Sequence, residues 1–450
     1  MRGTIGGEAG ENLTPIDIVE FVAAFSTIIL ETTDNPVIAI GRDGRISGSV
    51  ISNIVANTLV MMGINVVDTG LSTTPTLAMK VLHSEASGGI MITASHNGEN
   101  WNALKFFNHD GEFISQDMGM RLLELSQARQ FTFCTSHDLG TIEYDTHSVE
   151  AHVEAILQLS TVSVDAIKQR KFHVAVDCIN STGALGIPSL LDALGCTYTL
   201  LNEEITGQFE HDPEPLEKNL SKLSALVKDE KADLGVAVDP DVDRLAFMDE
   251  KGSYCGEEYT LVMVADWLLR HQTGNTVSNL SSTIALRKLT EHYGGTYAAS
   301  PVGEVHVVNK MKETMALIGG EGNGGVIYPA LHYGRDALVG IALILSALTE
   351  DDASLSKYRS KFPTYYMVKD KVPLASLESA DRILEDVASH FGDQEIDRAD
   401  GVKVYFDDGW THLRKSNTEP IVRLYSEGPS QDEAVRLANR VKEVIGSMTE

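Results

Sequence analysis

The sequence predicts an α/β protein in which three similar domains with mixed sheets are followed by a smaller α+β domain. Two observations lead to this class. Short apolar segments alternate with longer helical segments in three successive runs, which is typical of largely parallel sheets covered on both faces. From about Val368 the rhythm changes to strands that follow one another closely and end in a long helix. A chain of 450 residues is long enough for such a series of domains.

The first domain, which we place at residues 1–147, should open with a helix at Thr14. Thr14 can cap that helix, Pro15 suits its first position, and Asp17 suits its first turn. The elements expected next are strands over 37–40, 64–67 and 90–92, with helices over 47–62 and from about 75 to 83.

The other three domains are predicted at 148–253, 254–366 and 367–450. In the second we expect strands at 172–177 and 197–201, helices at 189–194 and 220–228, and an acidic loop at 203–215. In the third we expect helices at 257–270, at 282–294 and from 308, a strand at 275–279, and a glycine-rich loop at 318–325. In the last we expect helices at 381–390 and 432–447 and strands at 401–406, 409–413 and 420–425.

Composition argues against nucleic-acid binding, membrane association and cysteine metal sites. The net charge of -28 argues against nucleic acid and anionic membranes as partners, so a phosphorylated ligand would need a local basic pocket. The four cysteines are scattered without metal-ligand spacing, which favours free thiols in a reducing cytoplasm. No run of 18 apolar residues predicts a membrane span.

Three aspartates, Asp239, Asp241 and Asp243, lie at alternate positions between the apolar segments 234–238 and 245–247. In an extended segment this spacing places the three carboxylates on one side, where they repel one another unless a cation neutralises them. Oxygen-only ligands favour a hard ion, magnesium first. The sequence therefore predicts a metal-binding loop that emerges from buried β structure.

Two other interpretations compete for this loop. A calcium loop of the EF-hand type fits poorly, because Arg244 stands where that loop needs glycine and no amphipathic helix precedes it. A solvated acidic turn stays open on this segment alone.

A second polar turn, 93–97, follows the strand expected at 90–92 and carries Ser95 and His96. Loops at the carboxyl ends of such strands bind ligands, although an ordinary surface turn has a similar composition. His96 is adjacent to Ser95 and so is poorly placed as its base. Lys105, flanked by apolar residues, could have a lowered pKa and transfer protons, or it could extend its amine to solvent.

Two further segments have the composition of ligand loops. In 318–325 the glycines allow close approach to a ligand, while Glu321 and Asn323 offer hydrogen bonds suited to hydroxyl groups. The segment from His412 to Pro420, with the nearby Arg423, concentrates positive charge and donors in an acidic chain, which is the composition of a phosphate clamp. A flexible loop and a solvated turn are the respective alternatives.

Taken together, four of these segments resemble the α-D-phosphohexomutase superfamily in content and order. They are Thr93-Ala-Ser-His-Asn97, Asp239-Pro-Asp-Val-Asp-Arg244, Gly320-Glu-Gly-Asn323 and Arg414-Lys-Ser-Asn-Thr418. The resemblance covers essentially the whole chain and is strongest to the bacterial phosphoglucosamine mutases. The sequence departs from the family pattern in two places. The usual amino-terminal motif is cut short at Met1-Arg2-Gly3, which suggests a missing start, and 322–325 lacks the residues that commonly follow the sugar-binding glutamate.

The resemblance implies an enzyme that interconverts hexose 6-phosphate and hexose 1-phosphate, with four domains around a central cleft. Ser95 would carry the transferred phosphoryl group, and Mg²⁺ would be bound by that seryl phosphate and by Asp239, Asp241 and Asp243. Lys105 and Arg244 are both candidates for handling the hydroxyl proton. Contacts to the phosphoserine are implied for Arg2, Arg45 and His96. Sugar contacts are implied for Glu321 and Asn323, and contacts to the non-reacting phosphate for Arg414, Ser416, Asn417, Thr418 and Arg423.

On this basis the four domains carry, in order, the phosphoserine, the metal-binding loop, the sugar-binding loop and the phosphate clamp. The expected substrate is glucosamine phosphate, with phosphomannomutase or phosphoglucomutase activity as the alternative and a hexose 1,6-bisphosphate as activator. A non-catalytic sugar-phosphate-binding protein and a magnesium phosphatase are the rival functions. The expected assembly is a monomer or homodimer.

Overall fold

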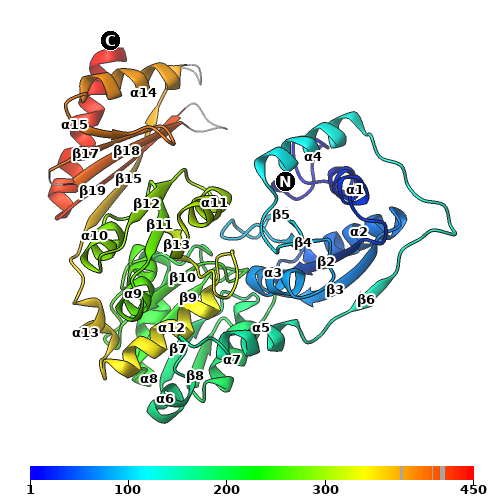
Figure 1. The fold of residues 1–450 in the computed structure, drawn as a ribbon, viewed down its shortest axis with the longest axis horizontal. Coiled ribbons are helices and arrows are strands. Elements are labelled where there is room, and N and C mark those ends of the chain that lie inside the picture. The colour runs from blue at the N-terminus through cyan, green and yellow to red at the C-terminus, as the bar shows by residue number, and fades with distance from the viewer. Residues whose placement is uncertain (375–378, 408, 416–420, 450) are drawn as a thin grey trace. The chain divides into compact units, whose positions relative to one another are not determined.

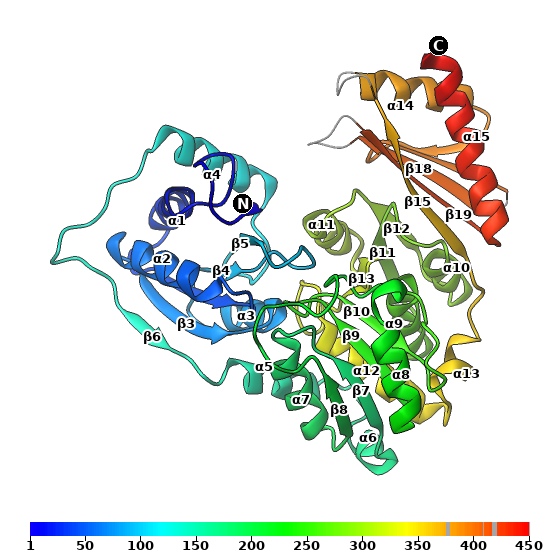
Figure 2. The same ribbon diagram turned by 180° about the vertical axis from the view of Figure 1, so that it is seen from behind.

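The computed structural model describes residues 1–374, 379–407, 409–415 and 421–449. By its internal contacts the chain divides into two units. The first comprises Met1–Gln272 and Leu317–Arg359, and the second comprises Thr273–Ala316 and Ser360–Glu450. Figures 1 and 2 show the elements of each unit from opposite sides.

The first unit begins with a six-stranded mixed sheet. Its order is β1 (Arg2–Thr4), β5 (Trp101–Phe107), β4 (Gly88–Ile92), β2 (Val37–Arg42), β3 (Asn65–Leu71) and β6 (Ile142–Tyr144). Strand β2 is parallel to both β3 and β4, whereas β5 is antiparallel to β4 and β1. Parallel neighbours need crossover helices, as the alternating sequence pattern predicted.

Both faces of this sheet are covered. Helices α1 (Pro15–Leu30), α2 (Gly48–Met61) and α4 (Gln116–Ala128) bury Phe25, Val55 and Leu122 with the strand residue Ile90 and its neighbours. Helix α3 (Thr74–Leu82) packs Leu77 and its neighbours against the alternate strand positions, such as Met91. Successive strand residues face opposite sides, so each apolar strand requires this double cover.

Asp17 fixes the start of α1. Its side chain is 5% exposed and accepts hydrogen bonds from the backbone N–H groups of Thr14 (2.9 Å) and Gly10 (2.8 Å). We expect Asp17→Ala to lower the free energy of unfolding by roughly 1–2 kcal/mol, because the buried N–H of Thr14 and the N–H of Gly10 both lose their acceptor. Urea unfolding followed by circular dichroism would measure this. The exposed Glu11→Ala is the control, and equal stability of both variants would contradict the assignment of a cap.

A second sheet in the same unit has the order β10 (Leu245–Met248), β9 (Leu234–Val238), β7 (His173–Asp177) and β8 (Thr197–Leu201). Strand β7 is parallel to β8 and β9, and β10 is antiparallel to β9. Its helices are α5 (Ser148–Leu157), α6 (Val164–Arg170), α7 (Gly183–Ala193) and α8 (Ser221–Glu230). The hairpin between β9 and β10 carries the three aspartates.

The third predicted domain contributes to both units. In the first unit, α9 (Glu257–His271) and α12 (Ala337–Glu350) accompany the antiparallel pair β13 (Ala316–Glu321) and β14 (Gly325–Ile327), followed by α13 (Leu355–Arg359). In the second unit, α10 (Ala285–His292) and α11 (Glu304–Thr314) accompany the parallel pair β11 (Asn275–Asn279) and β12 (Tyr297–Ser300). The predicted domain boundaries themselves stay predictions.

The last part of the chain is an antiparallel sheet with two helices, as the changed rhythm predicted. The sheet order is β15 (Tyr366–Pro373), β19 (Ile421–Gly428), β18 (Gly409–Lys415), β17 (Val402–Phe406) and β16 (Glu395–Asp397). Helices α14 (Ser379–His390) and α15 (Gln431–Thr449) share one core with it (Figure 1). The predicted fold class of three mixed-sheet α/β domains and a smaller α+β domain is confirmed.

Three predicted elements differ from the structure. Helix α7 begins at Gly183 rather than residue 189, because Pro188 lies inside the helix instead of opening it. Helix α11 begins at Glu304, directly after Gly303, rather than at 308. Residues 318–325 are not a loop but the end of β13, a tight turn and the start of β14, since glycines hide the apolar pattern of a strand.

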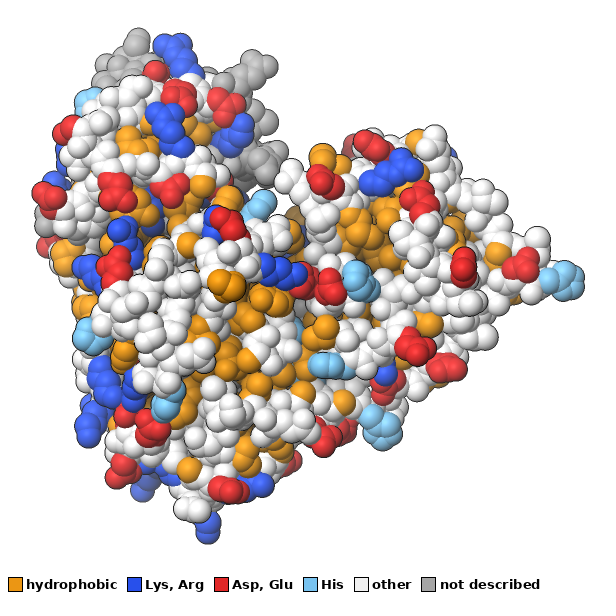
Figure 3. Space-filling model, viewed as in Figure 1, with side chains coloured by type: hydrophobic (Ala, Val, Ile, Leu, Met, Phe, Trp, Pro, Cys, Tyr) orange, Lys and Arg blue, Asp and Glu red, His pale blue; other side chains and the backbone are white. Residues whose placement is uncertain are grey.

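Within the described ranges, no helix is long and apolar enough to cross a membrane. The four cysteines are free thiols, as predicted. On the face drawn in Figure 3, acidic and basic side chains are interspersed.

Candidate active site

The three aspartates lie in the turn between β9 and β10, and all three are fully buried. One carboxylate oxygen of each lies within 4.8 Å of the others, which is close enough for all three to bind one ion. Between them Val242 has φ 63°, an unusual backbone conformation for a β-branched residue. In this turn the carboxylates of Asp241 and Asp243, on either side of Val242, lie close together. Strained backbone of this kind is concentrated at functional sites.

The surrounding charges and burial shift the pKa values of two of the aspartates in opposite directions. Burial, together with the charges of Asp241 and Asp243, raises the pKa of Asp239 well above its ordinary value. Burial alone would also raise the pKa of Asp243, but the neighbouring Arg335, Lys105 and Arg244 outweigh it and lower that pKa. The protein therefore supplies partial but incomplete compensation for three adjacent carboxylates.

The cluster fits a hard cation. The Oδ1 atoms of Asp241 and Asp243 are buried and have no hydrogen-bond partner among the described residues. A buried carboxylate oxygen without a partner is costly, and a divalent cation would remove that cost. The solvated acidic turn, the alternative left open for this segment, is excluded by the burial of all three side chains.

Ser95 lies at the edge of this cluster. It follows β4, is 2% exposed, and its Oγ donates a hydrogen bond of 2.6 Å to Asp239 Oδ2. Its backbone has φ 51°, and its N–H donates to Thr93 Oγ1 (2.9 Å). The structure thus brings Ser95 to the aspartate cluster, although Ser95 and Asp239 are 144 residues apart in sequence.

Arg45 holds the serine loop in place. Its guanidinium pairs with Asp43 (3.0 Å) and donates to four backbone carbonyls. These carbonyls belong to Ser95, Asn97, Gly98 and Trp101, at 2.5–2.9 Å. Arg45 is 1% exposed, so its donors are committed to the backbone of the loop. Asp43 also accepts from Thr93 Oγ1 (2.7 Å), which links the pair to the loop a second time.

His96 and Arg2 also lie at the serine loop. His96 Nδ1 is 3.5 Å from Ser95 Oγ, and burial together with Arg244 and Arg2 lowers the pKa of His96 to about 3. This imidazole is therefore neutral at pH 7. Arg2 donates to Asn97 Oδ1 (3.0 Å), which places its charge beside the same turn.

Lys105 and Arg244 flank the aspartates. Lys105 Nζ donates to Asp241 Oδ2 (2.6 Å) and Asp243 Oδ2 (3.0 Å). The possibility that Lys105 has a lowered pKa is wrong for this state: burial lowers the pKa, but the two carboxylates outweigh burial and raise it. Arg244 donates to Glu214 Oε1 (2.8 Å), while its buried Nε has no hydrogen-bond partner among the described residues and lies 3.9 Å from Asp239 Oδ2.

The glycine-rich segment reaches the same place. Glu321, at the end of β13, is 5% exposed and accepts a hydrogen bond from Arg335 Nη1 (3.1 Å). Arg335 Nη2 donates in turn to Asp243 Oδ2 (2.8 Å). Asn323 lies in the following turn, where its Oδ1 accepts from the N–H of Gly325 (3.2 Å).

The predicted clamp belongs to the second unit. Arg414 on β18 and Arg423 on β19 are directly paired across the strands, and Lys371 on β15 is paired with Arg423 on the other side. Cross-strand partners share a face, so three cations form a row, an arrangement that is unfavourable without an anion. Arg414 also donates to Asp400 (2.6 Å). The predicted clamp residues Ser416, Asn417 and Thr418 lie outside the described residues.

Comparison with known proteins gives the family. Four domains of the phosphoglucomutase/phosphomannomutase family match the chain in order. They are α/β/α domains I, II and III at residues 1–132, 150–252 and 256–366, and the C-terminal domain at 368–444. The chain belongs to the phosphoglucomutase/phosphomannomutase family. The resemblance to α-D-phosphohexomutases is thereby confirmed, and with it the prediction that the protein is an enzyme.

Individual relatives match nearly the full length of the chain. The chain is 34% identical to a phosphoglucomutase/phosphomannomutase of Thermococcus kodakarensis, covering 96% of each chain. It is 30% identical to a phosphoglucosamine/phosphogalactosamine mutase of Sulfurisphaera tokodaii, covering 99% of each. A crystal structure of a phosphoglucomutase/phosphomannomutase family protein from Burkholderia thailandensis matches with a TM-score of 0.87 and 24% identity, covering 99% of this chain and 96% of that one.

Sequence reasoning missed several residues of this phosphoglucomutase/phosphomannomutase family member, some at the aspartate cluster and one beside the predicted clamp. Arg335, directly before α12, is not among the predicted site residues. Thr74, which hydrogen-bonds Asp241, gives no sequence signal because hydroxyl residues are common at helix starts. Lys371 is identified only by its position opposite Arg423.

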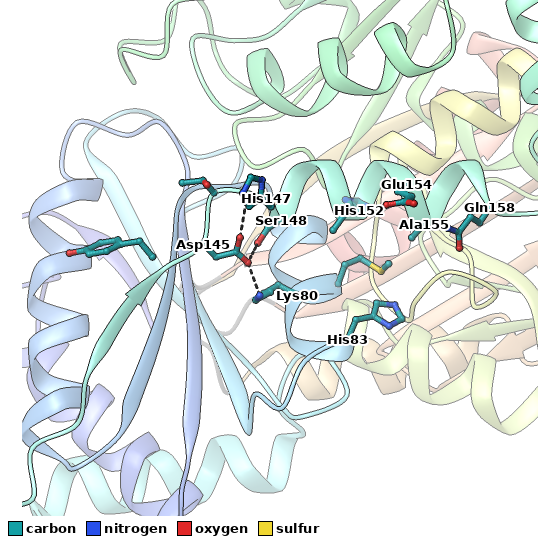
Figure 4. Close-up of a pocket in the computed structure, with 13 residues that line it drawn as sticks. Lys80, His83, Asp145, His147, Ser148, His152, Glu154, Ala155 and Gln158 are labelled. Atoms are coloured by element: carbon teal, nitrogen blue, oxygen red, sulfur yellow. Dashed lines mark hydrogen bonds and ion pairs between the residues drawn. The ribbon is translucent and has the colours of Figure 1, made fainter.

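A hollow of about 810 Å³ is lined by other residues of this family member, from α3, the segment 144–147 and α5 (Figure 4). At its rim Lys80 Nζ pairs with Asp145 Oδ2 (2.6 Å), and Asp145 also accepts from Ser148 Oγ (2.9 Å). None of the predicted site residues lines it, so we assign it no part in the chemistry.

Proposed function

We propose that this family member is a phosphohexomutase that interconverts hexose 6-phosphate and hexose 1-phosphate, with glucosamine phosphate as its principal substrate. The observation that carries this proposal is the hydrogen bond from Ser95 Oγ to Asp239, beside two buried carboxylate oxygens that have no hydrogen-bond partner among the described residues. A serine held at a cluster of carboxylates suited to a cation fits phosphoryl transfer and has no use in simple sugar binding.

The proposed reaction has two transfers. In the first, the phosphoryl group leaves Ser95 Oγ and forms a bond to the free hydroxyl of the sugar phosphate, giving a hexose 1,6-bisphosphate. In the second, the other phosphoryl group of the bisphosphate leaves its sugar oxygen and forms a bond to Ser95 Oγ, which regenerates the phosphoserine. The hydroxyl proton is lost in the first transfer and regained in the second, so no other reactant is consumed.

Mg²⁺ fits the aspartate cluster, where Asp239, Asp241 and Asp243 would hold it together with the oxygen atom carried by Ser95. The ion supplies neutralisation of the charge that develops on the transferring group. Arg45 keeps the serine loop in position through its carbonyl contacts. Lys105 and Arg244 both remain candidates for handling the proton. The raised pKa of Lys105 requires that its ion pairs with Asp241 and Asp243 be weakened before it can accept one.

Glu321 and Asn323 are proposed to contact the sugar, and Arg414 and Arg423 the non-reacting phosphate. A hexose 1,6-bisphosphate is proposed as the activator that first phosphorylates Ser95. The alternative substrates are mannose and glucose phosphates, which the name of the Thermococcus kodakarensis relative favours. A coupled assay with glucosamine 1-phosphate, mannose 1-phosphate and glucose 1-phosphate, with bisphosphate and Mg²⁺ present, tests the proposal. Absence of turnover of all three would contradict it, and release of inorganic phosphate would indicate a phosphatase.

The clamp gives a separate prediction. Arg423→Ala should raise KM at least about tenfold for every hexose phosphate, because one charge-assisted contact to the common phosphate is worth roughly 1.5–3 kcal/mol. The order of preference among the sugars should not change. Steady-state kinetics on three sugars measures both quantities. Arg436→Ala, which removes an equal charge from a pair within α15, is the control. A reordered preference in the Arg423 variant would assign sugar recognition to this sheet instead.

A further inference from the structure

Arg335 connects the two loops on which the proposed function rests. One guanidinium nitrogen donates to Glu321 Oε2 (3.1 Å) and the other to Asp243 Oδ2 (2.8 Å). The side chains of Arg335, Glu321 and Asp243 are 9%, 6% and 0% exposed, so this bridge is desolvated. A buried carboxylate–guanidinium pair fixes both partners more firmly than an exposed pair does.

The absence of a side chain at Gly325 leaves space for Arg335. A Cβ atom at Gly325 would come within 2.3 Å of Arg335 Cδ, so the arginine side chain occupies the space that a side chain at 325 would fill. Arg335 is also paired by a β-bridge to Ile327, the last residue of β14. The stem of the arginine is therefore packed against the strand pair that carries Glu321.

The residue after Arg335 anchors the segment from the other side. Asp336 accepts hydrogen bonds from the N–H groups of Leu338 and Val339 at the start of α12. Its second oxygen lies 2.9 Å from His152 Nε2 and 3.3 Å from His332 Nε2. With Asp336 fixed by four contacts, the guanidinium of Arg335 has a defined position before any ligand arrives.

The consequence is electrostatic. Because a buried arginine already compensates the charge of Glu321, this carboxylate can accept hydrogen bonds from a sugar without presenting an uncompensated negative charge. A hydroxyl group and an ammonium group on the sugar would then be recognised with similar strength. Without the arginine, the same carboxylate would favour the ammonium group, because the charge interaction would no longer be shared.

We propose that Arg335 is a specificity-determining residue that suppresses discrimination between amino and hydroxyl sugars in binding, so that the site binds hexose phosphates as well as the glucosamine phosphate proposed as the principal substrate. This inference rests on the proposed role of Glu321 in binding the sugar. It concerns the ratio of affinities for two sugars, and any effect of Arg335 on Asp243 and the cation would apply to both sugars equally.

The test is calorimetric titration of glucosamine 6-phosphate and glucose 6-phosphate in excess Mg²⁺, in a Ser95→Ala background that prevents turnover. With Arg335 present, the two dissociation constants should agree within about threefold. Arg335→Gln should shift their ratio towards glucosamine 6-phosphate by roughly tenfold, the effect of about one charge-assisted hydrogen bond. Arg335→Lys should restore a ratio near that of the parent, and Arg335→Met, which keeps the packed stem, should reproduce the shift if the Gln variant fails to fold.

An unchanged ratio in the Gln and Met variants would overturn the inference, even if both affinities fall, because Arg335 would then act only through Asp243. The turnover assay of the wild-type chain is independent of this result. A shifted ratio without wild-type turnover would refute the mutase but support the role of Arg335. Normal turnover with an unchanged ratio would do the reverse.

Discussion

Ser95→Ala should abolish mutase turnover while leaving the affinity for hexose phosphates nearly unchanged. The hydroxyl oxygen of Ser95 is the only atom that this variant removes, and in the proposed reaction it carries the transferred group in both steps. Loss of a covalent nucleophile lowers turnover by roughly four orders of magnitude or more. Binding depends on the sugar and phosphate contacts instead, which the variant leaves in place.

Steady-state turnover and calorimetric affinity, measured on the same preparation, check this prediction. Ser84→Ala, at an exposed position after α3, is the matched control and should behave like the wild type. Wild-type turnover by the Ser95 variant would refute a phosphoserine. A large loss of affinity together with turnover would instead show that Ser95 supports the shape of the site.

The second large effect is expected from the cation. Turnover should disappear in excess chelator and return with Mg²⁺, and Asp241→Asn should raise the Mg²⁺ concentration needed for half-maximal activity at least about tenfold. Asp241 is fully buried, and one of its oxygens lacks a partner among the described residues. Removing one of three ligand charges weakens a site for a hard cation, and charge count sets affinity in such sites.

Asp249→Asn is the matched control, because Asp249 is a nearly buried acid just after β10 whose Oδ1 accepts backbone hydrogen bonds that an amide oxygen can also accept. Activity titrated against Mg²⁺ separates the two variants. Full activity in chelator would remove the ion from the reaction, and equal Mg²⁺ requirements in the wild type and the Asp241 variant would remove Asp241 from the ligand set.

Much of the fold could be predicted because its signals are local. The capped start of α1 at Thr14 and the strand β11 at 275–279 both appear where the sequence places them. Helix α12 gave no such signal, since 12 of its 14 residues are buried and an evenly apolar segment has no helical period. The β13–β14 hairpin was missed for the opposite reason, because its glycines conceal a strand.

The candidate site followed the same division. The aspartates and Ser95 could be identified because their spacing and surroundings carry chemistry in the sequence itself. Arg335 and Lys371 meet Asp243 and Arg423, which lie far from them in the chain, and no local pattern records such contacts. The contact of Arg45 with the phosphoserine stays a prediction, and the structure adds that its guanidinium binds backbone carbonyls of the serine loop, that of Ser95 among them.

The most direct test of the central claim follows the phosphoryl group itself. The protein is incubated with a hexose 1,6-bisphosphate and Mg²⁺, separated from small molecules, digested, and mapped by mass spectrometry. The phosphorylated protein is then given hexose monophosphate. We predict a single phosphoryl group on Ser95 that leaves the protein and appears in newly formed hexose bisphosphate. A phosphoryl group on another residue, or its release as inorganic phosphate in place of transfer to the sugar, would contradict the mutase mechanism.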